Sequence, residues 1–296
     1  MAATPESLPA SLLHHAAVRP FEPWLFNALG WDWRWRSFAE AAAQVARWTA
    51  ELVALPAGSV AAFDGRPSPR SVLLDLAIQG AGLVAAPDAL AGDLPPDVRV
   101  TVEGEPAVEA EPAGTNRTIR LTADAVPAWR GAASEPAVAL PSSRPAGGVV
   151  VAGEAGPAVV SQGDLLAQAA RVAALLPTPS AKREIAVCSR PLADPVARGL
   201  LAWATVAGAA VMLEPDPLCL VPTAVWARPT VFAGGAAELV QLRAAIERRH
   251  RRPRRRALPL GRLRAVLLGG SEPLPDEERA FWSARGVAVS PFPRMV

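Results

Sequence analysis

The stretch 263–293 reads LRAVLLGGSEPLPDEERAFWSARGVAVSPFP. The order of apolar and polar residues predicts a buried strand at 264–268, a Gly-Gly turn, a helix at 276–284 and a second strand at 287–290. Before this stretch, the same pattern predicts a strand at 230–233 and a helix at 237–249. A strand, a crossover helix and a following strand form the unit from which parallel sheets are built. We therefore expect an α/β fold with mostly parallel strands.

Further from this stretch, the same alternation occurs twice, each time in the order helix, strand, helix, strand. The predicted elements are 37–55, 60–63, 71–80 and 83–86 in the first half, and 162–176, 184–188, 195–206 and 209–213 in the second. The two copies predict two similar α/β subdomains, at residues 1–145 and 146–296. The first would include a Pro-rich arm at 87–145, with short strands at 98–102 and 117–121.

Composition limits the classes of protein to consider. The chain has 296 residues, 51% of them hydrophobic and 20% charged, so it can bury a core of ordinary size and is not a disordered protein. Lysine occurs once, at Lys182, and tyrosine does not occur, so chemistry that needs either has almost no candidates. Cys188 and Cys219 are too few for a disulfide framework or a four-thiolate zinc site. We interpret both as inert packing residues.

The charge is unevenly distributed. Residues 248–256 read RRHRRPRRR, whereas the formal net charge of the whole chain is only +2, so the remainder is mildly acidic. This run is either a solvated loop or a site for an anionic ligand. Nucleic-acid binding is not expected, because no aromatic residue is interleaved with the arginines.

Targeting signals are not visible in the sequence. No basic region followed by a long apolar stretch opens the chain. The longest uncharged apolar segment, 199–213, is shorter than the roughly 20 residues that a membrane-spanning helix needs, and we interpret it as a buried helix that runs into a buried strand. We expect a cytoplasmic protein without a membrane span.

Histidine and tryptophan residues do not form a recognisable site. His14, His15 and His250 have no carboxylate or nucleophile partner in the pattern, and we expect them at the surface. The cluster WDWRWR at 31–36 is either an exposed patch for a partner or an edge strand whose tryptophans pack, and we favour the strand.

The most informative motif for function is GGVVVAGEAGPAVVSQGDLLAQA at 147–169, a strand, a Gly-containing turn and a helix opening. Together with the Gly-Gly-x-Glu-Pro-Leu-Pro pattern of 269–275, it resembles the N-terminal domain of the acyl-adenylating superfamily, which includes acyl-CoA synthetases, luciferases and peptide-synthetase adenylation domains. The resemblance covers about residues 15–296. It implies two α/β subdomains and an ancestral reaction of a carboxylate with ATP and magnesium, which yields acyl-AMP and pyrophosphate.

The resemblance also shows where this sequence departs from the family. The family's phosphate loop contains G-[ST]-T-G and a following lysine, and residues Gly153 to Gly156 would take the place of the first of these. The two hydroxyl positions are Glu154 and Ala155, and no lysine follows Pro157. We expect this loop to be a simple strand-to-helix turn that no longer binds phosphate.

Two other family motifs are altered. Where the family has a histidine in P-x-F-H, this chain has Asp194 or a neighbour. Where Y-G-x-T-E should follow 287–290, the chain has Phe292 and Pro293 and no Thr-Glu pair. The resemblance implies that a residual adenylate site would be lined by Gly153, Gly156, Gly269, Gly270, Ser271 and Glu272. We predict no catalytic residue and no metal ligand, and we expect ATP, AMP and magnesium not to be bound productively.

The leading hypothesis is a truncated, catalytically degenerate member of the AMP-dependent ligase class. It would act as a ligand- or partner-binding module beside a complete ligase or an acyl-carrier system. The alternative is the N-terminal part of a split active ligase that another polypeptide completes. A weaker alternative is a module that binds anions or nucleic acid through 248–256.

Overall fold

The computed structural model describes residues 5–29, 32–90, 95–102, 118–121, 145, 147–177, 183–214, 216–250, 261–270 and 273–295. The helices in these ranges are α1 (Leu8–Val18), α2 (Phe38–Leu52), α3 (Pro69–Gly80), α4 (Gln162–Leu175), α5 (Pro195–Ala207), α6 (Leu220–Ala227), α7 (Ala236–His250) and α8 (Asp276–Ser283), with short 3-10 turns η1 (Asp88–Leu90) and η2 (Pro217–Cys219). The strands are β1 (Pro23–Leu29), β2 (Asp32–Ser37), β3 (Val60–Phe63), β4 (Val84–Pro87), β5 (Val98–Val102), β6 (Thr118–Leu121), β7 (Val149–Gly153), β8 (Gly156–Val160), β9 (Ile185–Cys188), β10 (Ala210–Leu213), β11 (Val231–Gly234), β12 (Ala265–Leu268) and β13 (Ala288–Pro291).

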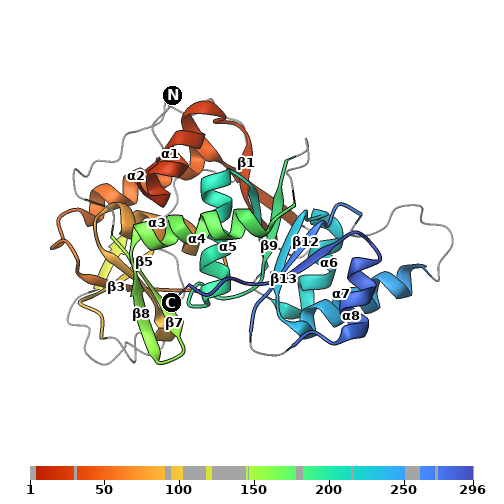
Figure 1. Cartoon of the computed structure of the whole chain (residues 1–296). Coiled ribbons are helices and arrows are strands. Elements are labelled where there is room, and N and C mark those ends of the chain that lie inside the picture. Colours follow the sequence, from red (N-terminus) through yellow and green to blue (C-terminus); the bar gives the residue numbers. More distant parts are fainter. Residues whose placement is uncertain are drawn as a thin grey trace.

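Two sheets organise the described residues (Figure 1). The first has the order β13-β12-β11-β9-β10-β1-β2, and the second has the order β6-β5-β3-β4-β7-β8. Neighbouring strands are parallel except in two hairpins, β1–β2 and β7–β8. The predicted α/β class with mostly parallel strands is therefore confirmed.

The sheets do not separate at the predicted subdomain boundary of residue 145. β1 and β2 precede this boundary but belong to the sheet of β9–β13, because β1 pairs in parallel with β10. β7 and β8 follow the boundary but complete the sheet of β3–β6, because β7 pairs with β4. Each half of the sequence thus contributes a hairpin to the sheet that is built mainly by the other half.

The main core lies between the two sheets. It contains buried residues of both sheets and of helices α1 to α5, including the fully buried Trp24, Trp48 and Phe38. A second core packs α6, α7 and α8 on the opposite face of the first sheet, around Phe232 and Trp282. Figure 1 shows these layers, with α4 and α5 in the middle and α6 to α8 on the far side of β9–β13. The interior helices are therefore apolar on more than one side.

Helix starts follow from local chemistry. Ser37 and Ser161 cap α2 and α4, and in each case the acidic residue three positions on bonds back to the capping residue's N–H. α3 and α5 begin with proline after Ser68 and Asp194, whose side chains cap the free backbone N–H groups. These signals explain why the predicted helices of the repeated alternation are confirmed to within three residues at each end.

Four elements were missing from the sequence prediction: α1, β1, β8 and α6. The apolar residues of α1 do not form a clear stripe, since it packs against α2, α3 and α5. The predicted edge strand within 31–36 is confirmed for β2, which lies at the edge of the first sheet. The expectation that its tryptophans pack is wrong for Trp35, which is 49% exposed because an edge strand has one open side. In the described parts of the chain, no helix is long and apolar enough to cross a membrane.

Candidate functional site

The two sheets approach each other at the carboxyl ends of their strands. Leu192 N, which follows β9, donates to Gly65 O, which follows β3, at 2.7 Å. Ala152 N of β7 donates to Ala193 O at 2.9 Å. Ligands of open α/β sheets bind outside the carboxyl ends of the strands, so this junction is the candidate site.

The turn between β7 and β8 is the predicted phosphate loop. Its two strands pair in register from Val149 and Val160 to Gly153 and Gly156, which leaves only Glu154 and Ala155 in the turn. Gly156 has a φ of +122°, a conformation that residues with a side chain rarely adopt. A phosphate cradle needs several N–H groups that face one cavity, whereas this backbone pairs with itself to the end of the hairpin.

The acidic side chain in this turn points to solvent. Glu154 Oε1 lies 3.4 Å from Arg294 Nη1, and the two side chains are 81% and 84% exposed. The turn therefore presents a carboxylate where the family loop presents hydroxyls. The side chains of Glu154 and Ala155 offer a triphosphate no hydrogen-bond donor.

The second predicted glycine pair follows β12. Gly269 N donates to Gly234 O at 2.9 Å, and a Cβ on Gly269 would lie 2.4 Å from Val196 Cγ2. Gly270 has a φ of +95° and open space where a Cβ would be. Since Val196 belongs to the start of α5 and Ala152 bonds to the residue before Asp194, both glycine pairs lie beside the segment that begins α5. Ser271 and Glu272 lie outside the described residues.

A charged cluster stands at this junction where the family has its histidine. Asp194 accepts hydrogen bonds from Val196 N at 2.7 Å and from Arg190 Nη1 at 2.6 Å. Arg190 Nη2 lies 3.8 Å from Glu238, which in turn accepts a hydrogen bond from Gly235 N at 2.7 Å. Partial burial opposes the charge of Arg190, but the two carboxylates outweigh it and raise the pKa of the guanidinium. The charges of this cluster are thus paired with one another.

Arg190 and Glu238 were not predicted from the sequence. The available signal was their position, because each follows the carboxyl end of a parallel strand, β9 or β11. Glu238 also lies three residues after Gly235, the second glycine of the pair at 234–235.

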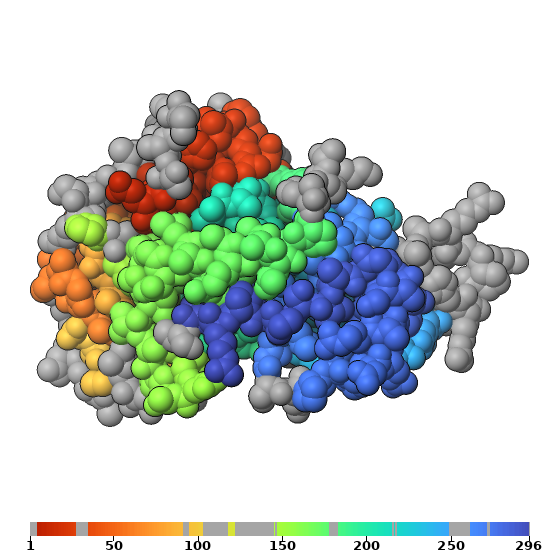
Figure 2. Space-filling model, viewed as in Figure 1, coloured from red at the N-terminus to blue at the C-terminus, as the bar shows by residue number. Residues whose placement is uncertain are grey.

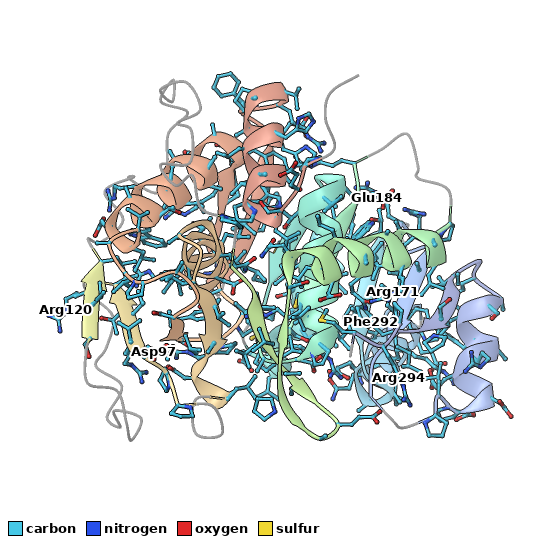
Figure 3. The ribbon with its side chains drawn as sticks, turned by 60° about the vertical axis from the view of Figure 1, so that its left-hand side comes forward. Asp97, Arg120, Arg171, Glu184, Phe292 and Arg294 are labelled. Carbon is cyan, nitrogen blue, oxygen red and sulfur yellow. The ribbon has the colours of Figure 1, made fainter. Side chains whose placement is uncertain are left out.

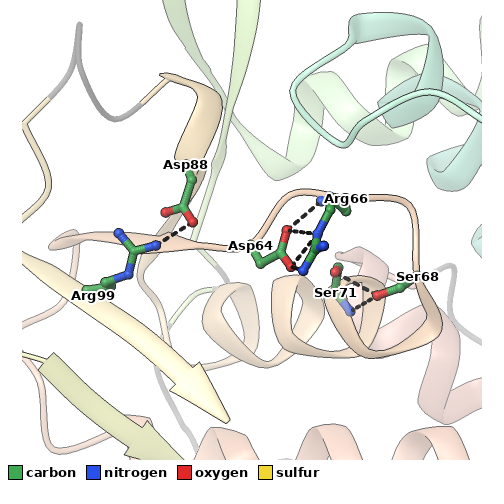
Figure 4. Close-up of polar contacts among 6 residues, drawn as sticks. All are labelled: Asp64, Arg66, Ser68, Ser71, Asp88 and Arg99. Carbon is green, nitrogen blue, oxygen red and sulfur yellow. Dashed lines mark hydrogen bonds and ion pairs between the residues drawn. The ribbon is translucent and has the colours of Figure 1, made fainter. Parts of the chain in front are cut away.

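The second sheet contributes further polar side chains at its carboxyl edge (Figure 4). Arg66 donates to both carboxylate oxygens of Asp64, with Nη2 at 2.6 Å from Oδ2, and Arg99 Nη2 lies 2.6 Å from Asp88. Partial burial raises the pKa of Asp64, but the bonds from Arg66 outweigh it and lower it overall. These pairs too were not predicted.

The segment after β13 crosses this region as a strap, residues 292–295 (Figure 2). Phe292 N donates to Leu268 O at 2.8 Å, and Gln168 of α4 donates to Pro293 O at 2.6 Å. The ring of Phe292 packs against Gly199, where a Cβ would lie 2.5 Å from it. Figure 3 shows Phe292 and Arg294 on this segment. Phe292, which the resemblance places at the tyrosine of Y-G-x-T-E, therefore packs against α5, and the next residue is bonded to α4.

Cysteine chemistry is absent from the described residues of the site. Cys188 is buried, and burial raises the pKa of its thiol to about 12, so it is an inert packing residue as predicted. Cys219 is exposed rather than packed, and its hydrogen bond to Asp216 raises the pKa of the thiol. In the same described part of the chain, no group of three His, Cys, Asp or Glu side chains could hold a metal ion.

The prediction of surface histidines is confirmed for His14 and wrong for His15. His15 is buried, with Nε2 at 3.0 Å from Val206 O and Nδ1 near the Arg19 guanidinium. The end of α1 docks on the end of α5, which encloses the ring. The side chain of His250 and most of the arginine run 248–256 lie outside the described residues.

No protein-family model and no curated protein sequence matches this chain. Many solved structures share its architecture, and the chain has the fold of the N-terminal domain of adenylate-forming enzymes. It is similar to the N-terminal domain of FACL13 from Mycobacterium tuberculosis, with 16% identity and a TM-score of 0.68 over 96% of this chain and 74% of that one.

Two further solved structures are similar to this chain over most of its length. The nonribosomal peptide synthetase FmoA3, solved with AMPPNP bound, has 17% identity and a TM-score of 0.72 over 97% of this chain and 31% of that one. Wild-type MenE from E. coli, solved with an analogue of OSB-AMS, has 20% identity and a TM-score of 0.62 over 94% of this chain and 58% of that one. The predicted fold resemblance is thereby confirmed.

Proposed function

We propose that this chain is a degenerate relative of the AMP-dependent ligases that binds a ligand or partner and does not activate a carboxylate with ATP. The observation that supports this most directly is the two-residue turn between β7 and β8. In the ancestral reaction, the loop at this place would hold the phosphates while the carboxylate attacks the α-phosphorus and pyrophosphate leaves. A hairpin that pairs up to Gly153 and Gly156 offers no such cradle.

Electrostatics at the turn support the same proposal. The carboxylate of Glu154 would repel a bound triphosphate, because both are anionic. Water screens this repulsion, as it screens the attraction to Arg294, since both side chains are more than 80% exposed. The only lysine of the chain, Lys182, is far from this position in the sequence.

The partner in this proposal is a complete ligase or an acyl-carrier protein. Such a role needs the fold to be stable, and the continuous core between the sheets provides for that. Analytical ultracentrifugation with a purified acyl-carrier protein, and separately with a complete acyl-CoA synthetase, tests the partner directly. Co-sedimentation with neither one contradicts this part of the proposal.

The loss of adenylate binding is tested by a thermal-shift titration with ATP–magnesium and with a non-hydrolysable acyl-adenylate mimic. A ligand that binds the folded state raises Tm once its concentration exceeds Kd. We expect no shift up to millimolar concentrations of either ligand. A clear shift with either one contradicts the proposal and favours the split-ligase alternative.

A variant separates the charge of the turn from its shape. Glu154→Thr with Ala155→Thr removes the acid and restores hydroxyls, while the hairpin register stays as it is. We expect the Tm of this variant to stay unchanged in the same titration, because the paired backbone still lacks free N–H groups. A shift that appears only in the variant would assign the loss to the side chains of Glu154 and Ala155 and not to the paired backbone of the turn.

A further inference from the structure

A buried ion pair joins α3 to α5 between the two sheets. Arg198 Nη1 lies 2.5 Å from Asp75 Oδ2, and the two side chains are 3% and 7% exposed. Gln79 Nε2 donates to the same oxygen at 2.7 Å. Both of these donors therefore converge on Oδ2 of the carboxylate.

Three polar atoms of this pair have no partner among the residues that the structure describes. They are Asp75 Oδ1, Arg198 Nε and Arg198 Nη2. Buried polar groups without a partner lose their hydration and gain nothing in return, and this cost is greatest for charged groups. Burial also raises the pKa of the Asp75 carboxyl, so a further donor to Oδ1 would stabilise its charged form.

Both side chains line a cavity of about 10 Å³. The other polar side chains of its wall are already engaged: Thr205 donates to Leu201 O at 2.7 Å, and the amide of Gln79 bonds to Asp75 and Gln162. The remaining wall is apolar and consists of Leu8, Val72, Leu76, Val149, Leu165 and Leu201. A cavity of roughly 10–15 Å³ holds one water molecule, and nothing larger fits.

We propose that this cavity binds one internal water molecule that completes the Asp75–Arg198 pair. The water accepts a hydrogen bond from Arg198 Nη2–H and donates one to Asp75 Oδ1. Two partners lie within the range of two to four that buried waters in proteins have. The pair, Gln79 and the water then form a closed polar unit that links α3 to α5 within an otherwise apolar core.

The experiment is a crystal structure of the full chain, sharp enough to show ordered waters, combined with relaxation-dispersion measurements of long-lived water in solution. We expect a density peak within hydrogen-bond distance of both side chains, and a long-lived water signal. The double variant Asp75→Leu with Arg198→Met removes the three polar atoms and should lose both. A matched control, Asp64→Ala with Arg66→Ala, removes a pair at the sheet edge and should keep both.

Two outcomes would overturn the proposal. One is an empty cavity in the wild-type crystal structure. The other is a turned guanidinium that bonds both oxygens of Asp75 directly, so that Oδ1 has a protein donor in place of the water. If the double variant does not fold, the wild-type density still decides, and Arg198→Lys provides the second test. That variant keeps the charge but lacks Nε and Nη2, so we expect the water peak to weaken or move.

Discussion

The ion pair between the sheets and the ion pair at the β7–β8 turn differ mainly in their surroundings. Asp75 and Arg198 are almost completely buried and are 2.5 Å apart, whereas Glu154 and Arg294 are largely exposed and 3.4 Å apart. Water and salt screen the exposed pair, but every partner of the buried pair matters. The candidate site is thus shaped by backbone pairing in the hairpin, and the polar contacts that hold the molecule together lie behind it.

The largest effect is expected from breaking the buried pair on one side. Arg198→Met alone, or Asp75→Leu alone, should lower the free energy of unfolding by about 3–5 kcal/mol, because each leaves an uncompensated buried charge. The double variant should recover most of this loss. Urea denaturation in a double-mutant cycle measures it. Single variants that cost no more than a surface substitution would remove the contrast between the two pairs.

The next effect concerns the amide that ties three segments together beside this pair. Gln162 accepts from Leu8 N at 3.0 Å and donates to Gln79 Oε1 at 2.7 Å and to Gly147 O at 2.5 Å. Gln162→Leu leaves these buried partners unpaired and should cost about 1–3 kcal/mol in urea denaturation. Gln241→Leu, on the exposed side of α7, is the control and should change little.

His15 is intermediate between the buried pair and the exposed pair, since its residue is 8% exposed. Burial, followed by the charge of Arg19, lowers its pKa from 6.5, although the Val206 carbonyl opposes this. The folded state then binds a proton less readily than the unfolded state, so stability should fall as the pH drops below 6.5. His15→Gln should flatten that part of the stability–pH curve, and His14→Gln should not. An unchanged slope in the first variant would contradict the assignment.

A smaller effect is expected at the exposed end of α6. Arg228 closes this helix with φ 50° and ψ 58°, in the left-handed region. Arg228→Gly should raise the free energy of unfolding by about 1 kcal/mol, because this conformation costs a residue with a side chain roughly that much. Ala227→Gly, one residue earlier and inside the helix, should do the opposite. Equal effects of the two variants in urea denaturation would exclude this explanation.

The smallest effect is expected at the turn itself. Arg294→Ala should leave the free energy of unfolding unchanged within error, because exposed pairs contribute almost nothing. Differential scanning calorimetry of this variant beside wild type is sufficient. A clear drop in Tm would mean that the strap depends on this contact. The exposed pair would then stabilise the fold, as the buried pair does.

Much of the fold could be predicted from the sequence because its signals are local. β3 lies where the pattern placed a strand, at 60–63, and α8 begins at the predicted Asp276. The hairpins that exchange between the sheets could not be predicted, because nothing near Leu25 indicates that it pairs with Val211. The same holds for His15, whose partner Val206 lies far along the chain.

The candidate site was predicted only in part. The sequence alone pointed to a turn at Gly153 to Gly156 that lacks the hydroxyls and lysine of a phosphate loop. It did not indicate that the strands on either side pair up to the turn, since that depends on hydrogen bonds between residues of both strands. Arg190 and Glu238 come together because parallel strands end at one edge, which only the strand order establishes.

Residue types and their spacings were enough to predict the α/β class, the repeated alternation and the altered residues of each adenylation motif. They did not indicate which strands share a sheet, that the turn is closed, or that Asp75 meets Arg198 in the core. The physical reason is the same in each case: hydrogen bonds and ion pairs between distant segments depend on where the backbone brings them.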